Sequence, residues 1–343
     1  FRAGQKYFGG KPILVTTNPN IIGAEEGEWP TIEELLGEQF GPEQLTYVMG
    51  WLKSAREAIS KGIFRPGQLL ALAGEAGCGK SLFQSMVTEM LGGRVAKPYR
   101  YMTGNTQFNS DLFGAEHLAI EDEAASTDLR TRREFGANIK NLIVNESHSF
   151  HAKGRDAMNL PAFWRVTVSL NDEPENLMVL PPLDESLRDK VMLFKLSKPS
   201  CFEKNDTLEK RRKFRQTSTK ELPAFLFMLS KWKVPRAYKD QRYGVKAFQH
   251  PDLLEQLNML SPEHRLAELI AGADIYDAAD DTWEGTAMEL EKILRGHDGA
   301  AADRLFTFNS ACGTYLARLR IKQPERFETK KSGNVTKWII RKK

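Results

Sequence analysis

The sequence contains few cysteines and no long hydrophobic run. Cys78, Cys201 and Cys312 are its three cysteines, and they lie far apart. Such spacing matches neither a disulfide framework nor a zinc site, and it is typical of a reducing compartment. No uninterrupted run of about 18 apolar residues is present, so no membrane span is predicted. We therefore expect a cytoplasmic protein with no membrane partner.

The charge of the chain is small in total but unevenly distributed. The formal net charge is +4, and the segment from Tyr315 to Lys343 holds ten Lys or Arg residues against two Glu. A basic segment of this kind predicts contact with a polyanion. The alternative is a solvated basic surface that only aids solubility. The chain begins at Phe1 with no signal-peptide pattern, which is consistent with a piece of a longer protein.

Short apolar segments alternate with helical patterns over the first two hundred residues. Helical spacing of apolar residues recurs in three stretches, 31–61, 81–91 and 132–144. Four apolar segments are short enough for buried strands: 68–73, 118–120, 163–170 and 190–196. This alternation predicts an α/β fold with a parallel sheet flanked by helices. Polar clusters follow the strands, where open α/β sheets bind ligands.

The C-terminal region has a different pattern. Two helix candidates, 283–294 and 309–320, precede two β-rich stretches, 327–331 and 335–341, that are joined by Ser-Gly-Asn. This order predicts a β-hairpin after two helices. Helix, helix and hairpin in sequence are the plan of a winged helix, in which the second helix enters a groove and the hairpin follows the phosphate backbone.

The strongest motif is glycine-rich and follows the first predicted strand. It reads Gly74-Glu75-Ala76-Gly77-Cys78-Gly79-Lys80-Ser81 and fits GxxxxGK[ST], the P-loop. We expect Gly74, Gly77 and Gly79 to take positive φ, so that backbone N–H groups surround phosphates. Lys80 would reach the β- and γ-phosphates, and Ser81 would bind Mg²⁺. We expect this whole loop, with Leu82 after it, to bind the nucleotide at a helix N-terminus.

An acidic cluster follows the second predicted strand. It reads Glu121-Asp122-Glu123. Asp122 is the candidate that holds Mg²⁺, and Glu123 is the candidate general base that polarises the attacking water. Because Glu121 stands where an apolar residue is usual, the register of the three is open by one position.

The order of these motifs resembles superfamily 3 helicases of the phage and plasmid primase-helicase type, which are related to papillomavirus and parvovirus replication helicases. The resemblance covers about residues 66–196. The P-loop corresponds to motif A, and Asp122-Glu123 corresponds to motif B. Val168-Ser169-Leu170-Asn171 resembles motif C, whose Asn is expected to sense the γ-phosphate and to help place the attacking water.

A basic segment between these motifs resembles the family's B-prime motif. It reads Ala152-Lys153-Gly154-Arg155. By resemblance, Lys153 lies on a hairpin that enters the channel of a ring and grips single-stranded DNA. The papillomavirus protein has a His after this Lys, whereas this chain has Gly154. We therefore expect that DNA contact to be absent or to come from His151 or Arg155.

A cation that reaches the ATP of the neighbouring subunit is expected before the last core strand. The best alignment places Lys190 there, with Arg188 two residues earlier. Such a cation stabilises the charge on the transferring phosphoryl group, and Lys lacks the planar fork of Arg. We favour Arg188 and Lys190 together. The open alternative is an arginine among Arg130, Arg132 and Arg133.

The resemblance implies an ATP- and Mg²⁺-dependent DNA helicase, an ATP hydrolase that moves 3′ to 5′ along single-stranded DNA as a homo-oligomeric ring, with a hexamer expected. It also implies a role in the replication of a phage, plasmid or other mobile element, with a primase domain or other replication proteins as partners. A P-loop ATPase that loads or remodels proteins on DNA without unwinding is the main alternative. A monomeric kinase and a DNA-binding regulator with an ATP switch stay open as well.

Length and pattern together predict four regions. Residues 1–45 are expected to be an N-terminal extension or linker, and 46–197 to be the P-loop ATPase core. Residues 198–280 read as a helical lid or linker with no motif, and 281–343 as the basic winged-helix-like domain.

Overall fold

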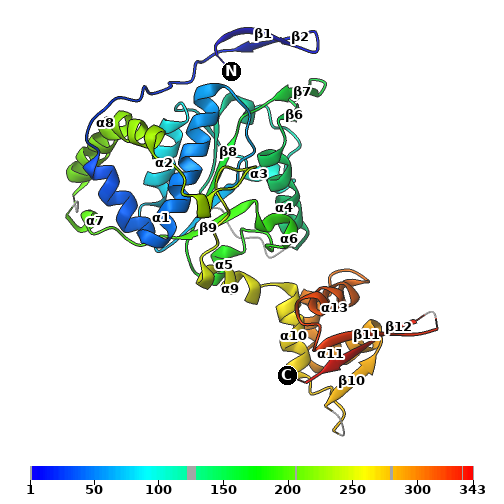
Figure 1. The fold of residues 1–343 in the computed structure, drawn as a ribbon. Coiled ribbons are helices and arrows are strands. Elements are labelled where there is room, and N and C mark those ends of the chain that lie inside the picture. Colours follow the sequence, from blue (N-terminus) through cyan, green and yellow to red (C-terminus); the bar gives the residue numbers. More distant parts are fainter. Residues whose placement is uncertain (1, 122–128, 205–206, 279–280, 334, 343) are drawn as a thin grey trace. The chain divides into compact units, whose positions relative to one another are not determined.

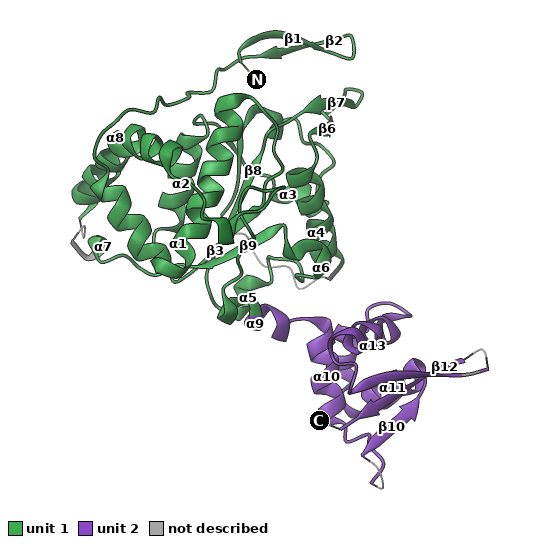
Figure 2. Ribbon diagram, in the orientation of Figure 1, with its two compact units in different colours: residues 1–254 green, residues 255–343 purple. Residues whose placement is uncertain are grey.

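The chain folds into two compact units. The computed structural model describes residues 2–121, 129–204, 207–278, 281–333 and 335–342. The units are Phe1–Leu254 and Glu255–Lys343, green and purple in Figure 2. The boundaries predicted near residues 45, 197 and 280 lie inside one unit or the other and stay predictions. Across the described ranges, no helix is both long and apolar enough to cross a membrane.

The first unit is built on a five-stranded parallel sheet. Its strand order is β4-β5-β8-β3-β9, so β8 lies between β5 and β3. The strands are β3 (Leu69–Ala73), β4 (Val95–Ala96), β5 (His117–Ile120), β8 (Arg165–Leu170) and β9 (Val191–Lys195). The predicted parallel sheet is confirmed, and four of its strands fall in the four apolar segments. The two-residue β4 was not predicted because it is too short to show a pattern.

The central strands are buried on both faces. Every residue of β3, β5 and β8 is buried, as expected for parallel strands that are covered on both faces. Figure 1 shows α1 (Pro30–Lys61), α2 (Lys80–Met90) and α8 (Leu208–Lys231) on one side of the sheet. It shows α3 (Tyr99–Met102), α4 (Leu129–Val144) and α6 (Glu185–Arg188) on the other. The sheet is therefore flanked by helices, as predicted.

Helix α1 is broken at Gly41, in its first half. Gly41 has φ 62° and ψ 174°, and Pro42 follows it. The predicted helix over 31–61 is thus two segments, because Pro lacks the N–H of a regular turn. Beside the break, Gln44 Nε2 donates to Phe40 O (3.0 Å) and Lys195 O (2.8 Å), and Gln44 Oε1 accepts from Lys195 N. The break therefore turns a glutamine toward the end of β9.

Two antiparallel hairpins and several short helices complete the first unit. The hairpins pair β1 (Gly4–Phe8) with β2 (Lys11–Val15), and β6 (Ser147–Phe150) with β7 (Met158–Pro161). The short helices are η1 (Leu112–Gly114), α5 (Pro174–Leu177), α7 (Cys201–Lys204) and η2 (Arg236–Tyr238), and α9 (Pro251–Met259) runs into the second unit. The region 197–280 is therefore largely helical, as its pattern indicates, and α8 packs on α1.

The second unit combines helices with a three-stranded antiparallel sheet. The sheet order is β10-β12-β11. Its elements, in chain order, are α10 (Pro262–Gly272), β10 (Thr282–Gly285), α11 (Ala287–His297), α12 (Gly299–Leu305), α13 (Ala311–Lys322), β11 (Phe327–Ser332) and β12 (Val335–Arg341). The predicted hairpin corresponds to β11 and β12.

The predicted helix over 283–294 was wrong at its start. Trp283 pairs with Ile340 in the sheet, and the helix begins only at Ala287. Thr286 and Glu289 form a capping box there, with Thr286 Oγ1 accepting from Glu289 N and Thr286 N donating to the Glu289 carboxylate. The Thr-x-x-Glu signature was visible in the sequence and marks the true helix start.

A glycine in α1 tests the packing of the first unit. A Cβ on Gly50 would lie 2.7 Å from Val245 Cγ2, whereas a Cβ on Gly37 of the same helix would meet nothing within 4 Å. We expect Gly50→Ala to lower the free energy of unfolding by about 1–3 kcal/mol. Gly37→Ala should raise it by up to about 1 kcal/mol, because alanine favours helix.

Urea denaturation of the two variants measures both effects. Equal stability of Gly50→Ala and Gly37→Ala would contradict this packing.

Candidate nucleotide site

The glycine-rich loop joins the end of β3 to the start of α2. Gly77 has φ +80° and Gly79 has φ +92°, as expected for a loop that turns N–H groups inward. The same expectation for Gly74 was wrong, because its φ is not positive. Glycine is needed there for space instead. A Cβ on Gly74 would lie 2.7 Å from Leu196 O and 2.9 Å from Cys78 Sγ.

Lys80 is the centre of polar contacts in the loop. Its Nζ donates to Gly74 O (2.6 Å), Glu75 O (3.0 Å) and Asn171 Oδ1 (3.0 Å). An ammonium group has three protons to donate, and each has an acceptor here. Asn171 comes directly after β8, ninety-one positions from Lys80. The structure therefore brings together two residues that the sequence singled out separately.

The remaining loop residues divide by exposure. Ser81 is exposed in the first turn of α2, with Leu82 half-buried beside it, and Glu75 and Ala76 are exposed. Cys78 is buried, and burial raises the pKa of its thiol, although the nearby Lys80 acts in the opposite direction. Cys78 therefore packs as an apolar residue, while Ser81 offers its hydroxyl at the helix N-terminus.

Gln39 supports the loop from outside and was not predicted. Its Nε2 donates to Cys78 O (2.7 Å), and its backbone oxygen accepts from Ser197 N (3.0 Å). The side chain is fully buried. Gln39 lies just before the break in α1, thirty-nine positions from Cys78. Only the break, a Gly-Pro pair inside a helical pattern, hinted at a special role for this segment.

The acidic cluster is described only in part. Asp122 and Glu123 lie outside the described residues, so their predicted roles with Mg²⁺ and water stay predictions. Glu121 is described, and its carboxylate pairs with Lys97 Nζ at 3.4 Å on the surface. Within the described ranges, no group of three His, Cys, Asp or Glu side chains is arranged to hold a metal ion.

The segment around Arg188 and Lys190 is firmly held. Lys190 Nζ contacts Asp189 Oδ1 at 2.7 Å, and its side chain is 15% exposed. Gln249 Nε2 donates to the backbone oxygens of Arg188 and Val191, both at 2.7 Å. Burial alone would raise the pKa of the Asp189 carboxyl, but the hydrogen bond and charge of Lys190 lower it below its usual range. Arg188, in contrast, is exposed at the end of α6.

The alternative arginines on α4 differ in their surroundings. Arg132 is buried, and its Nε and Nη2 donate to Leu180 O at 3.1 and 2.9 Å. This geometry ties Arg132 to its own chain. Arg130 and Arg133 are exposed on the same helix.

The predicted DNA-binding residues lie on the β6–β7 hairpin, which projects from the first unit in Figure 1. Arg155 N donates to Ala152 O (3.2 Å), and Gly154 has φ +74°. This tight turn requires a left-handed residue at Gly154, which explains glycine where the papillomavirus protein has His. Lys153 and Arg155 are exposed at the turn.

His151 directly follows β6, whereas Lys153 and Arg155 lie at the turn of the hairpin. Its backbone N–H donates to Asn109 Oδ1 (2.8 Å), and its backbone oxygen accepts from Asn109 N (3.1 Å). Its ring lies 5.1 Å from that of Phe108, between centroids. Asn109 is buried and also donates to Ser149 O, so it anchors the hairpin. Sequence reasoning missed it, because a lone Asn in a loop carries no motif.

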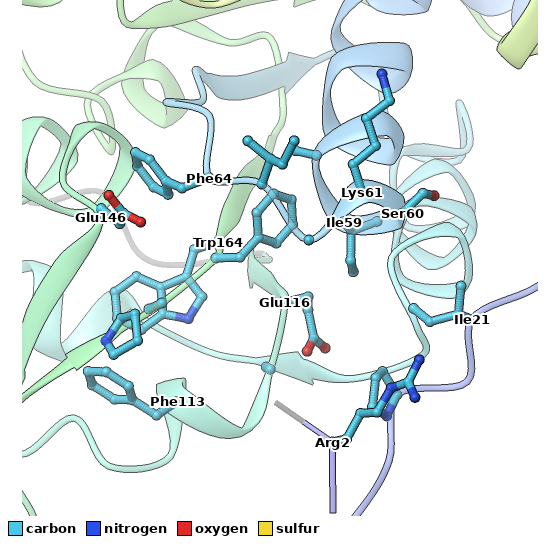
Figure 3. A pocket seen from close by; sticks show the side chains of 18 residues that line it. Arg2, Ile21, Ile59, Ser60, Lys61, Phe64, Phe113, Glu116, Glu146 and Trp164 are labelled. Atoms are coloured by element: carbon cyan, nitrogen blue, oxygen red, sulfur yellow. The ribbon is translucent and has the colours of Figure 1, made fainter. Parts of the chain in front are cut away.

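A cavity of about 630 Å³ lies at the opposite edge of the sheet, where the strands begin. Figure 3 shows Phe64, Phe113 and Trp164 around it, with Glu116 and Arg2 nearby. Its wall includes the end of α1 and the base of the hairpin. None of the residues predicted to bind nucleotide or DNA lines it.

Comparison with known proteins places the chain by fold. Residues 72–188, from the P-loop strand to Arg188, match a family described only as a family of unknown function, DUF5906. Two apo structures of the C-terminal region of NrS-1 are each 13% identical and cover 98% of this chain and 82% of theirs, with TM-scores of 0.57 and 0.58. A search among curated proteins finds no match.

A structure of JCV Helicase also matches, with 10% identity over 71% of this chain and 70% of that chain. Its TM-score of 0.33 is too low to carry an argument. The likeness to the NrS-1 region shows a shared fold along nearly the whole chain. What the chain shares with the NrS-1 region is its architecture, and the function must be argued from the site.

Two glycines of the loop give a test that separates space from backbone conformation. Gly77 has positive φ and a Cβ there would meet nothing within 4 Å, whereas at Gly74 a Cβ would collide with backbone. We expect Gly77→Asn to lower the free energy of unfolding less than Gly77→Ala does, by up to about 1 kcal/mol, because Asn tolerates left-handed backbone. Gly74→Asn should lower the free energy of unfolding at least as much as Gly74→Ala does.

Chemical denaturation and nucleotide-induced thermal shifts of the four variants measure this pattern. If the Ala and Asn variants ranked in the same order of stability at both positions, the two glycines would be required for the same reason.

Proposed function

We propose that this chain is the motor of an ATP-dependent DNA helicase, a single-stranded DNA translocase of the superfamily 3 type. The observation that carries the proposal is the convergence of Lys80 and Asn171 at the carboxyl edge of the sheet, with Nζ and Oδ1 3.0 Å apart. In a P-loop ATPase a cation binds the β- and γ-phosphates, and a polar residue on a neighbouring strand orients the attacking water. The contact between Lys80 and Asn171 supports these two roles for them.

The residues around this pair fit Mg²⁺ and ATP. Ser81 presents an exposed hydroxyl next to Lys80, and hard oxygen ligands are those that Mg²⁺ prefers. In the proposed site Ser81 and Asp122 would hold the ion, which would supply positive charge to the phosphates. The loop N–H groups and Lys80 bind the phosphate oxygens, Glu123 takes a proton from the attacking water, and Asn171 orients that water.

The exposed Arg188 supports a site that is shared between subunits. A guanidinium from a neighbour stabilises the charge that develops on the transferring phosphoryl group. Lys190 is engaged by Asp189 at 2.7 Å, so Arg188 is the better candidate for the contact and Lys190 for its local support. Hydrolysis then depends on assembly of a ring, which we propose to be a hexamer.

The hairpin supports DNA contact. Lys153 and Arg155 present two cations at an exposed turn, and His151 adds an imidazole below them. The hairpin leads directly into β8, and β8 ends next to Asn171. A six-residue buried strand thus joins the proposed DNA contact to the proposed phosphate sensor. Phosphate contacts carry no sequence information, so we expect sequence-tolerant, salt-dependent translocation with 3′-to-5′ polarity.

The second unit supports a further contact with nucleic acid or a replication protein. Its order of α10, β10, α11, α12, α13 and the β11–β12 hairpin supports the plan of a winged helix, with α12 as an added short helix. Lys330 and Lys337 on the hairpin flank Glu284 at 3.6 and 3.4 Å. The segment is strongly basic, which favours a polyanion, although winged helices also dock proteins. We propose this unit as a winged helix that serves replication of a mobile element.

Hydrolysis and unwinding test the proposal directly. We expect ATP hydrolysis to be stimulated by single-stranded DNA, and Lys80→Ala to lower its rate by about 100-fold or more. Lys153→Ala should abolish unwinding of a forked duplex and change basal hydrolysis less than about twofold, with the salt slope of DNA binding shallower by about 0.7 for each lost phosphate contact. Lys233→Ala, an exposed lysine elsewhere on the first unit, is the matched control.

Hydrolysis that ignores DNA, without unwinding, would overturn the helicase proposal. Unwinding that survives Lys153→Ala would favour a protein that loads or remodels others on DNA.

Mixed rings test whether Arg188 acts across subunits. Lys80→Ala and Arg188→Ala should each lose about 100-fold in hydrolysis rate when assembled alone. A mixture should regain activity, because some interfaces then combine an intact Lys80 with an intact Arg188 from the neighbour. Steady-state hydrolysis at varied mixing ratios measures this. If the mixture stays inactive, Arg188 acts within its own subunit or not at all.

A further inference from the structure

A closed ring of hydrogen bonds lies beneath the loop, between α2 and the sheet. Gln84 Nε2 donates to Thr167 Oγ1 (2.9 Å), and Thr167 Oγ1 lies 2.8 Å from His117 Nε2. His117 Nδ1 lies 2.7 Å from Thr88 Oγ1, which donates to Gln84 O at 3.0 Å. Gln84, His117 and Thr167 are almost completely buried.

The protons in this ring have one consistent arrangement. Thr88 gives its proton to Gln84 O, so it accepts from His117, which must carry its proton on Nδ1. The bare Nε2 then accepts from Thr167, which in turn accepts from Gln84. Burial lowers the pKa of His117 to about 3, so the imidazole is neutral near pH 7. A second proton on the His117 imidazole would turn Nε2 from an acceptor into a donor and break the ring of hydrogen bonds.

The ring joins the three elements that carry the proposed catalytic groups. Lys80, Gln84 and Thr88 are four residues apart on α2 and therefore share one helix face. Gln84 Nε2 also donates to Ile120 O (3.2 Å), the last residue of β5 before the acidic cluster. Thr167 lies in β8, four residues before Asn171.

Stability alone does not explain this arrangement. Within the part of the chain that the structure describes, Gln84 Oε1 is buried without a hydrogen-bond partner. An unsatisfied buried oxygen costs about 1–3 kcal/mol, and an apolar side chain of similar size avoids that cost. A buried polar network with an unsatisfied member therefore calls for another role.

We propose that the ring of Gln84, Thr167, His117 and Thr88 is a positioning device, which sets the phosphate-binding helix in register with β5 and β8. The inference rests on the proposed ATPase function and assigns it positioning residues. The ring holds the helix that carries Lys80 against the strand that carries Asn171. None of the four residues belongs to the phosphate-binding loop. The ring therefore acts on the rate of hydrolysis more than on nucleotide affinity.

Thr167 gives the sharpest test. Thr167→Val keeps the shape of the side chain and removes the hydroxyl, and Thr167→Ser restores the hydroxyl. A displacement of about 1 Å at a reacting group costs on the order of 100-fold in rate. We expect Thr167→Val to lower kcat for ATP by about 10- to 100-fold, while the Kd for a fluorescent ATP analogue changes less than about threefold. Thr167→Ser should return kcat to within about threefold of the wild type.

Ile139→Val is the stability control. Ile139 is buried in α4, away from the ring, and the change costs about 0.5–1.5 kcal/mol. It should leave kcat unchanged at a temperature where every variant is folded. A kcat within twofold of the wild type for Thr167→Val, an equal loss in Ile139→Val, or failure of Thr167→Ser to restore the rate would each overturn the inference.

A measurement without hydrolysis tests the ring itself. A ¹⁵N NMR spectrum, assigned by comparison with a His117→Gln variant, should show His117 as the Nδ1–H tautomer, and the Nε2–H tautomer would overturn the ring as drawn. Absence of ATP hydrolysis in the wild type would count against the proposed function, and the inference would fall with it. Wild-type hydrolysis with an unaffected Thr167→Val variant would overturn the inference alone.

Discussion

The contacts of one buried ammonium group organise the proposed active site. Lys80 Nζ is held by two carbonyl oxygens of its own loop and by the amide oxygen of Asn171. A buried cation is costly unless hydrogen bonds replace its water. The loop must therefore close tightly around the lysine, and β8 must end beside it. Both conditions constrain the surrounding chain.

The tight loop depends on close backbone approach. Gly74 lies against Leu196 O at a distance that leaves no room for a Cβ. Gln39 Nε2 donates to Cys78 O of the loop, and Gln39 lies in α1 just before its break at Gly41. The break in α1 and the glycine in the loop thus serve the same purpose, which is to pack β9 and α1 closely around the phosphate-binding backbone.

The second condition depends on strand order. Because β8 lies between β5 and β3, residues after these three strands meet at one edge of the sheet. The same strand begins just after the β6–β7 hairpin, so the proposed DNA contact and the proposed sensor lie near opposite ends of one buried strand. The hydrogen-bonded ring beneath them ties this strand to α2. The proposed motor would need such rigid connections, since a small shift at the phosphates would have to reach the DNA.

The amino-acid sequence by itself determined the P-loop, the four main strands, the α/β class and the C-terminal hairpin. Each depends on residues close together in the chain, where spacing and apolar runs reflect local geometry. The start of α11 was visible in the Thr286-x-x-Glu289 signature, but the strand at Trp283 was not, because an aromatic residue suits a strand or a helix until its partner Ile340 is known.

Only the tertiary structure decided why Gly74 is a glycine, that Gln39 and Asn109 support the site and the hairpin, and that Arg132 is bound within its own chain. The buried ring through His117 and Thr167 belongs with these. Those side chains carry no local pattern, because their partners in these hydrogen bonds lie 39 to 50 positions away along the chain. Their roles follow from which strands lie side by side, and strand order is set by packing of the whole sheet.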